Sequence, residues 1–146
     1  MIAAYGDSPV NSKNYRSRYR VLLVEDHEPL AEATAEFIRD KGLEVQIASN
    51  GREALEIAAS FQPELILCDM RLPDMPGYEV AQALRAMPVG KDAVIAMHTA
   101  MNDIDLHNLD DDTHTVINLF LSKPITAEKL DMLISRLPAH RSPKRL

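Results

Sequence analysis

The stretch RVLLVEDHEPL, residues 20–30, sets the pattern from which the rest of the chain can be interpreted. Its first half, Arg20–Val24, is an almost continuous apolar run, which is typical of a strand buried on both faces of a sheet. Two acids, Glu25 and Asp26, follow this run directly. An amphipathic segment, with proline in its first turn and glycine just after its end, then predicts a helix over Glu28–Lys41.

The same order of apolar run and amphipathic segment recurs along the chain. Four more runs are predicted to be strands: Glu44–Ala48, Leu65–Cys68, Ala93–His98 and Asn118–Ser122. Three more segments are predicted to be helices: one from Asn50, which with Glu53 resembles a capping box, to about Ser60, then Tyr78–Met87 and Thr126–Leu137. Five strands that alternate with helices predict an α/β fold built on a parallel sheet.

Length and composition fit one globular domain. The chain has 146 residues, of which 46% are hydrophobic and 26% are charged, and this is enough apolar surface for a core. A bilayer crossing needs ~20 apolar residues, and no apolar run approaches that length. The one cysteine, Cys68, excludes an intramolecular disulfide, and we expect it to be a small buried apolar residue. We therefore expect a soluble protein in a reducing, cytoplasmic setting, without membrane contact.

The charges are distributed unevenly along the chain. The formal net charge is −6, but residues 1–20, with four bases and one acid, carry +3. Residues 139–146, with three bases, also carry +3, which leaves −12 on residues 21–138. We expect a flexible basic N-terminal extension over 1–18, one domain over 19–138 and a basic C-terminal tail over 139–146. The acidic body argues against direct binding of nucleic acid.

Polar residues stand at the carboxyl ends of four predicted strands. They are Glu25 and Asp26 after the first, Asp69 after the third, Thr99 after the fourth and Lys123 after the fifth. Any one of them alone is more often a turn residue or helix cap. A parallel sheet, however, gathers these ends on one rim, where ligands bind in open α/β sheets. Three carboxylates at such a rim repel one another unless a hard cation such as Mg²⁺ binds between them.

Aspartate at this rim can also act as a nucleophile. Attack by Asp69 on a phosphoryl group would form an acyl phosphate. The metal and the Lys123 ammonium would offset the charge of the phosphoryl oxygens, and the Thr99 hydroxyl could donate a hydrogen bond to one of them.

Four segments carry a resemblance to a known family. They are VLLVEDHEPL (21–30), ELILCDMRLPDMPGYEV (64–80), AVIAMHTA (93–100) and FLSKPI (120–125). In their order and spacing the chain resembles the receiver domain of two-component response regulators, of the chemotaxis-receiver type, over residues 21–137. The resemblance implies a doubly wound, flavodoxin-like five-stranded parallel sheet with strand order 2-1-3-4-5 and helices on both faces.

The resemblance also implies a function in phosphorelay signal transduction. Asp69 would be the phosphoacceptor, and Mg²⁺ would be held by Glu25, Asp26, Asp69 and the backbone carbonyl of Arg71. The phosphoryl donor would be a sensor histidine kinase or a histidine phosphotransfer protein. The domain would add and lose its own phosphoryl group rather than turn over external substrates, so we do not expect an enzyme in the usual sense.

The resemblance also implies which residues take part in switching and which shape the loops. The resemblance implies that Thr99 is the switch hydroxyl, Lys123 the phosphate-binding lysine and Phe120 the aromatic residue that turns on phosphorylation. Three residues are expected to shape loops beside the site: Pro73, Gly77 and Pro124, the last after a cis peptide bond.

Residues 101–117, MNDIDLHNLDDDTHTVI, depart from the family's pattern. Three consecutive acids followed by Thr-His-Thr make a poor helix interior, so we predict a short or irregular fourth helix and a longer loop. The acids are either a solvated loop or part of a partner site. In the family the fourth helix, fifth strand and fifth helix report phosphorylation, and a homodimer through this face is one of two alternatives here, beside a monomer. For His27 and His98 we expect structural or solvent roles.

Two other functions and two contexts are compatible with the same residues. A pseudo-receiver would bind a partner without being phosphorylated. A haloacid-dehalogenase-type phosphatase would need a second aspartate two residues after the nucleophile, where this chain has Arg71. The chain is either a stand-alone regulator that acts on a downstream protein target or a piece of a longer protein whose effector domain is missing.

Overall fold

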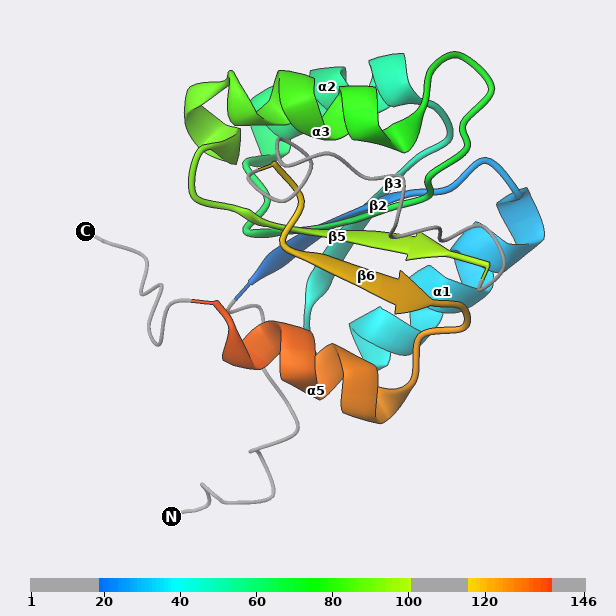
Figure 1. Cartoon of the computed structure of the whole chain (residues 1–146). Coiled ribbons are helices and arrows are strands. Elements are labelled where there is room, and N and C mark those ends of the chain that lie inside the picture. Colours follow the sequence, from blue (N-terminus) through cyan, green and yellow to red (C-terminus); the bar gives the residue numbers. More distant parts are fainter. Residues whose placement is uncertain (1–18, 101–115, 138–146) are drawn as a thin grey trace.

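The computed structural model describes residues 19–100 and 116–137. Its centre is a sheet of five parallel strands (Figure 1). The strands are β2 (Arg20–Val24), β3 (Glu44–Ala48), β4 (Leu65–Cys68), β5 (Val94–Thr99) and β6 (Leu119–Ser122). They lie in the order β3-β2-β4-β5-β6, which in chain order is 2-1-3-4-5. The predicted doubly wound α/β fold and its strand order are confirmed.

Helices cover both faces of the sheet. They are α1 (Glu28–Asp40), α2 (Gly51–Phe61), α3 (Gly77–Arg85) and α5 (Ala127–Ser135), with a short 3-10 helix η2 (Pro88–Gly90) that the sequence did not predict. In Figure 1, α2 and α3 lie on one face, and α1 and α5 on the other. The predicted boundaries agree with these to within two residues. The predictions for residues 1–18, 101–115 and 139–146 lie outside the described residues.

The sheet separates two apolar clusters. Val21 and Leu23 of β2 pack on the α1/α5 side, whereas Leu22 and Val24 pack on the α2/α3 side. All four are at most 1% exposed, because successive side chains of a strand point to opposite faces and both faces are covered. This burial explains why the strand appears in the sequence as a continuous apolar run.

Side-chain caps define where three helices begin. His27 Nδ1 accepts a hydrogen bond from the N–H of Leu30, and Thr126 caps α5 by accepting from the N–H of Lys129. Asn50 caps α2 by accepting from the N–H of Glu53. The predicted capping box is only half right, because the Glu53 carboxylate accepts from the N–H of Ser49, at 2.6 Å, rather than from that of Asn50. The structural role expected for His27 is confirmed.

One half-buried guanidinium joins the ends of several elements at the amino-terminal side of the sheet. Arg85 donates hydrogen bonds to the backbone carbonyls of Gly90, Lys91, Ala93 and Val116. It also donates one to the side-chain amide oxygen of Asn118. Asn118 Oδ1 also accepts from the N–H of Ile95, at 2.7 Å. These bonds fix the starts of β5 and β6 relative to α3.

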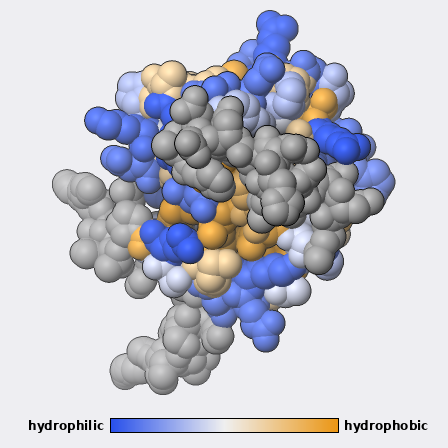
Figure 2. Space-filling model, in the orientation of Figure 1, coloured by the Kyte–Doolittle hydropathy of each residue, from blue (hydrophilic) through white to orange (hydrophobic). Residues whose placement is uncertain are grey.

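Polar residues cover most of the described surface in Figure 2, and apolar residues gather in the middle of that face, where β6 forms the edge of the sheet. Leu119 and Phe120 of β6 are half-buried. This edge and α5 belong to the face for which a homodimer and a monomer are the two alternatives, and both stay predictions. None of the described helices is long and apolar enough to cross a membrane.

Candidate functional site

The strand register brings the predicted site residues to one rim. Three of these residues come directly after a strand, and the backbone N–H of each continues the hydrogen bonding between neighbouring strands. The N–H of Glu25 donates to the carbonyl of Ala48 (2.9 Å), that of Asp69 to Val24 (3.0 Å), and that of Lys123 to Thr99 (2.8 Å). These bonds hold Glu25, Asp69 and Lys123 on the same carboxyl edge of the sheet, after β2, β4 and β6, as the sequence predicts.

A lysine ammonium bridges two carboxylates at this rim. Lys123 Nζ lies 2.7 Å from Glu25 Oε1 and 3.1 Å from Asp69 Oδ2. The side chains of Glu25, Asp69 and Lys123 are 4%, 12% and 20% exposed, so the ion pairs are largely buried. The second oxygen of each carboxylate accepts a backbone N–H, from His27 (3.1 Å) and Arg71 (3.3 Å).

These contacts keep Lys123 charged. Burial alone lowers the pKa of the ammonium, but the hydrogen bonds and charges of Glu25 and Asp69 outweigh it, so the pKa lies above its usual value. Lys123 therefore places a positive charge within hydrogen-bond distance of the Asp69 carboxylate.

The acidic residues of the rim form a set that suits a hard cation. Glu25, Asp26 and Asp69 each offer a carboxylate oxygen, and these oxygens lie within 4.8 Å of one another. Asp26 is exposed, so the set opens to solvent on one side. Oxygen-only ligands with room for water are what Mg²⁺ prefers, and the three side chains fit such an ion.

The loop after Asp69 is folded tightly against the end of β4. The N–H of Gly77 donates to the carbonyl of Met70 (2.8 Å), and Arg71 forms an isolated bridge with Pro76. A Cβ at position 77 would collide with the carbonyl oxygen of Asp69, so only glycine allows the loop to return this closely. This contact supports the loop-shaping role expected of Gly77.

Asp74 connects that loop to the beginning of α2, and sequence reasoning missed it. Its carboxylate oxygens accept from the N–H groups of Gly51 (2.8 Å) and Arg52 (2.9 Å). These bonds lower the pKa of Asp74 below its usual value. An aspartate between Pro73 and Pro76 could have been noticed in the sequence as a residue able to cap a helix. The residues whose N–H groups it binds are 22 and 23 positions away in the chain, so the sequence does not show which helix it caps.

The predicted switch residues lie on β5, the strand next to the one that Asp69 follows, and on β6, the edge strand beyond it. Thr99 is fully buried at the end of β5, where it pairs in register with Ser122 of β6. Phe120 pairs with Met97 and is half-buried against the α2/α3-side cluster. The Lys123–Pro124 peptide bond is cis, as the resemblance implies.

Two buried groups near the rim are neutral. His98 is 2% exposed, and its Nε2 has no hydrogen-bond partner among the described residues. Burial, with the charges of Lys123 and Lys129, lowers its pKa to about 4. Burial also raises the pKa of the Cys68 thiol, as do the charges of Asp69 and Glu25, so Cys68 is a buried apolar residue as predicted.

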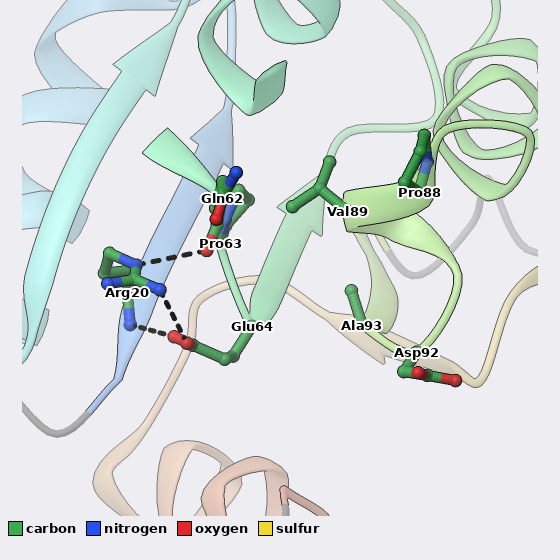
Figure 3. A pocket seen from close by; sticks show the side chains of 8 residues that line it. All are labelled: Arg20, Gln62, Pro63, Glu64, Pro88, Val89, Asp92 and Ala93. Carbon is green, nitrogen blue, oxygen red and sulfur yellow. Dashed lines mark hydrogen bonds and ion pairs between the residues drawn. The ribbon is translucent and has the colours of Figure 1, made fainter. Parts of the chain in front are cut away.

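A separate pocket of about 200 Å³ lies at the amino-terminal side of the sheet (Figure 3). There Arg20 Nη2 pairs with Glu64 Oε2 at 3.0 Å, its Nε donates to the carbonyl of Gln62, and its backbone N–H donates to Glu64 Oε1. Because this arginine and glutamate satisfy each other and join β2 to the start of β4, we assign them a structural role.

Comparison with known proteins identifies the family. The model of the response regulator receiver domain matches residues 21–135, and the chain belongs to this family. A response regulator receiver protein of Anaeromyxobacter sp. strain Fw109-5 is 45% identical over 82 residues, which are 56% of this chain and 34% of that protein. The probable transcriptional regulator ycf29 of Porphyra purpurea is 32% identical over 123 residues, 82% of this chain and 56% of that protein. The chain thus spans about half or less of the length of these relatives.

Solved structures agree with this assignment. The response regulator TrrA of Thermotoga maritima, solved in complex with Mg²⁺ and BeF, superposes with a TM-score of 0.68 at 28% identity. The match covers 82% of this chain and 99% of that one. The chain is therefore a receiver domain of a two-component phosphorelay, that is, a signalling domain.

Proposed function

We propose that Asp69 accepts a phosphoryl group from a phosphohistidine, in the presence of Mg²⁺, and that the phosphorylated domain controls a partner protein. The observation that carries this proposal is the pairing of Lys123 with both Glu25 and Asp69, next to Asp26. It combines a buried carboxylate nucleophile, a fixed cation and a set of metal-binding oxygens in one pocket.

The transfer is a substitution at phosphorus. A carboxylate oxygen of Asp69 forms the new O–P bond, the P–N bond of the phosphohistidine breaks, and the electron pair leaves with the imidazole nitrogen, which takes up a proton. The Lys123 ammonium would then pair with the phosphoryl oxygens, which carry the negative charge after the transfer. The Thr99 hydroxyl would donate a hydrogen bond to one of these oxygens. Glu25, Asp26, Asp69 and the carbonyl of Arg71 would hold Mg²⁺, which when bound supplies further positive charge beside those oxygens.

Phosphorylation would act as a switch because it adds ~1.5–2 negative charges to the rim. Thr99 and Lys123 would move toward the phosphoryl group, and Phe120 would turn inward into the space that Thr99 leaves. Such a change shifts an equilibrium between two existing conformations, so that partners meet a different surface.

Membership of the receiver family supports a proposal for the donor and the output. A sensor histidine kinase or a histidine phosphotransfer protein would supply the phosphohistidine, in the cytoplasm. The output would be a downstream protein target or an effector domain of a longer protein. A homodimer through β6, α5 and the fourth helix is a further form that the output could take.

The test is labelling with radioactive acetyl phosphate in the presence of Mg²⁺. Wild-type protein should acquire an acid-stable label that hydroxylamine removes, because an acyl phosphate reacts with this nucleophile. Asp69→Asn should acquire none, whereas Asp92→Asn, an exposed aspartate at the opposite end of the sheet, should be labelled like the wild type.

Other outcomes identify the alternatives. Wild-type protein that is folded but takes up no label, and binds no beryllofluoride, would be a pseudo-receiver. Continuous hydrolysis of external phosphate esters would point to a phosphatase. Label retained by Asp69→Asn would contradict the assignment of the acceptor.

A further inference from the structure

The first turn of α5 contains a lysine whose ammonium turns back to the loop before the helix. Lys129 Nζ donates to the carbonyl of Ser122 (2.7 Å), to the Ser122 hydroxyl (3.0 Å) and to the carbonyl of Pro124 (3.3 Å). No carboxylate pairs with Lys129 in the part of the chain that the structure describes. Neutral oxygens of one short loop therefore hold a full positive charge.

That loop contains the site lysine. Ser122 and Pro124 are the two chain neighbours of Lys123, so Lys129 binds the backbone on both sides of it. Lys123 itself is fixed in the middle, where its N–H donates to the carbonyl of Thr99 (2.8 Å). Its ammonium extends from this base to Glu25 and Asp69. The direction of the Lys123 side chain thus depends on a loop that Lys129 holds in shape.

Helix stability does not explain a lysine at this place. The amino-terminal turn of a helix carries a partial positive charge, which disfavours a cation there. The backbone N–H of Lys129 is already satisfied by Thr126. A residue that opposes its local preference is expected where another gain compensates, and here the gain is the set of bonds around Lys123.

We infer that Lys129 is a positioning residue for Lys123, which it holds in the acidic pocket in the orientation needed to meet a phosphoryl group on Asp69. The inference rests on the phosphoacceptor function proposed above. Loss of the Lys129 ammonium would release the carbonyls on both sides of Lys123, and the Lys123 ammonium would then spend less time between Glu25 and Asp69.

Two measurable effects of opposite sign follow. Phosphorylation slows, because the cation that offsets the phosphoryl charge is no longer held in place. Mg²⁺ binds more tightly, because Lys123 competes less for the carboxylates of Glu25 and Asp69. General damage to the rim would instead weaken both reactions.

The experiment compares three single variants with the wild type. Lys129→Met removes the charge and keeps the apolar stem, Lys129→Arg keeps the charge, and Lys91→Met removes an exposed lysine elsewhere. The measurements are the rate of phosphorylation by acetyl phosphate and the dissociation constant of Mg²⁺ by calorimetry without a phosphodonor. Lys129→Met should react about 10- to 100-fold more slowly, the range found for residues that orient a binding group, and should bind Mg²⁺ more tightly. Lys129→Arg should restore both values, and Lys91→Met should change neither.

A double variant shows whether Lys129 acts through Lys123. In a Lys123→Ala background, Lys129→Met should have no further effect on either measurement. Equal slowing in both backgrounds, or weaker Mg²⁺ binding by Lys129→Met, would overturn the inference. Lys129→Gln replaces the methionine variant if the latter does not fold. If wild-type protein takes up no phosphoryl group, the proposed function fails, while the Mg²⁺ titrations still test the role of Lys129.

Discussion

Replacement of the buried histidine His98 by leucine should make the protein less sensitive to mild acid. His98 is 2% exposed on β5, and its Nε2 has no partner among the described residues. The charged groups that face it, Lys123 and Lys129, both oppose a second positive charge. The folded protein therefore takes up a proton on this imidazole only with difficulty.

The size of the effect follows from the difference between two pKa values. The pKa of His98 falls from 6.5 to about 4 on folding, so between these values the unfolded chain binds more protons than the folded one. Stability therefore rises with pH in this window and is lost as the pH falls from about 6.5 to 4. At 1.36 kcal/mol per pKa unit the whole window amounts to about 3 kcal/mol, of which about 2 kcal/mol should be lost between pH 7.5 and pH 5. This is a large part of the ~5–15 kcal/mol by which domains are stable.

The assay is urea unfolding of wild-type protein and His98→Leu at pH 7.5, 6.5, 5.5 and 5. At pH 7.5 the variant should be at least as stable as the wild type, since leucine replaces a buried imidazole whose Nε2 has no partner within residues 19–100 and 116–137. At pH 5 the wild type should have lost about 2 kcal/mol more than the variant. Other titrating groups are common to both proteins and cancel in this difference. Parallel stability curves for the two proteins would refute the reasoning.

Three further changes test the loop, its contact with α2 and the cation site. Gly77→Ala should lower the free energy of unfolding by about 1–3 kcal/mol, because its methyl group meets the backbone carbonyl of Asp69. Gln82→Ala, an exposed position on the same helix, is the control, and an equal effect of both would contradict this explanation. Asp74→Asn should make the free energy of unfolding depend less on pH in acid. The pKa of Asp74 is lower in the folded protein than its unfolded value of 3.8, so the carboxylate stabilises the fold above pH 3.8. This contribution is lost as the pH falls through the folded pKa. Unfolding at pH 5, 4 and 3 measures it, and an unchanged profile would count against the Asp74 contacts with α2. Asp26→Asn should weaken Mg²⁺ binding about 10-fold or more in calorimetry with little change in stability, because the side chain is exposed; undiminished affinity would remove Asp26 from the cation site.

The strands and the rim could be predicted because both depend on simple rules of chain direction. A strand covered on both faces is apolar at its buried positions, which made Arg20–Val24, with its four buried residues, and Leu65–Cys68 visible with their observed bounds. Since parallel strands end at the same edge, the residues after them had to meet, and Glu25, Asp69 and Lys123 do so. Their roles as acceptor, metal ligand and phosphate-binding lysine stay predictions.

Contacts between side chains and distant loops could not be predicted in the same way. Asp74 and Lys129 carry no sequence signal for their partners, because a carboxylate or an ammonium on a loop or a first helical turn is usually solvated. Which acceptor each one finds depends on how loops close in three dimensions. The short helix Pro88–Gly90 was missed for a related reason, since three residues are too few to show a helical period.

The division of the interior by the sheet has a consequence for how such a domain can diversify. Neighbouring residues such as Val21 and Leu22 belong to opposite compartments, so the packing beneath α1 and α5 can be redesigned without disturbing that beneath α2 and α3. The proposed phosphoryl transfer would depend on neither compartment alone, because Glu25, Asp69 and Lys123 lie on the edge that both share. Substitutions on one side of the sheet could therefore adapt that side to a new partner protein, while the packing of the other side and the positions of Glu25, Asp69 and Lys123 are kept.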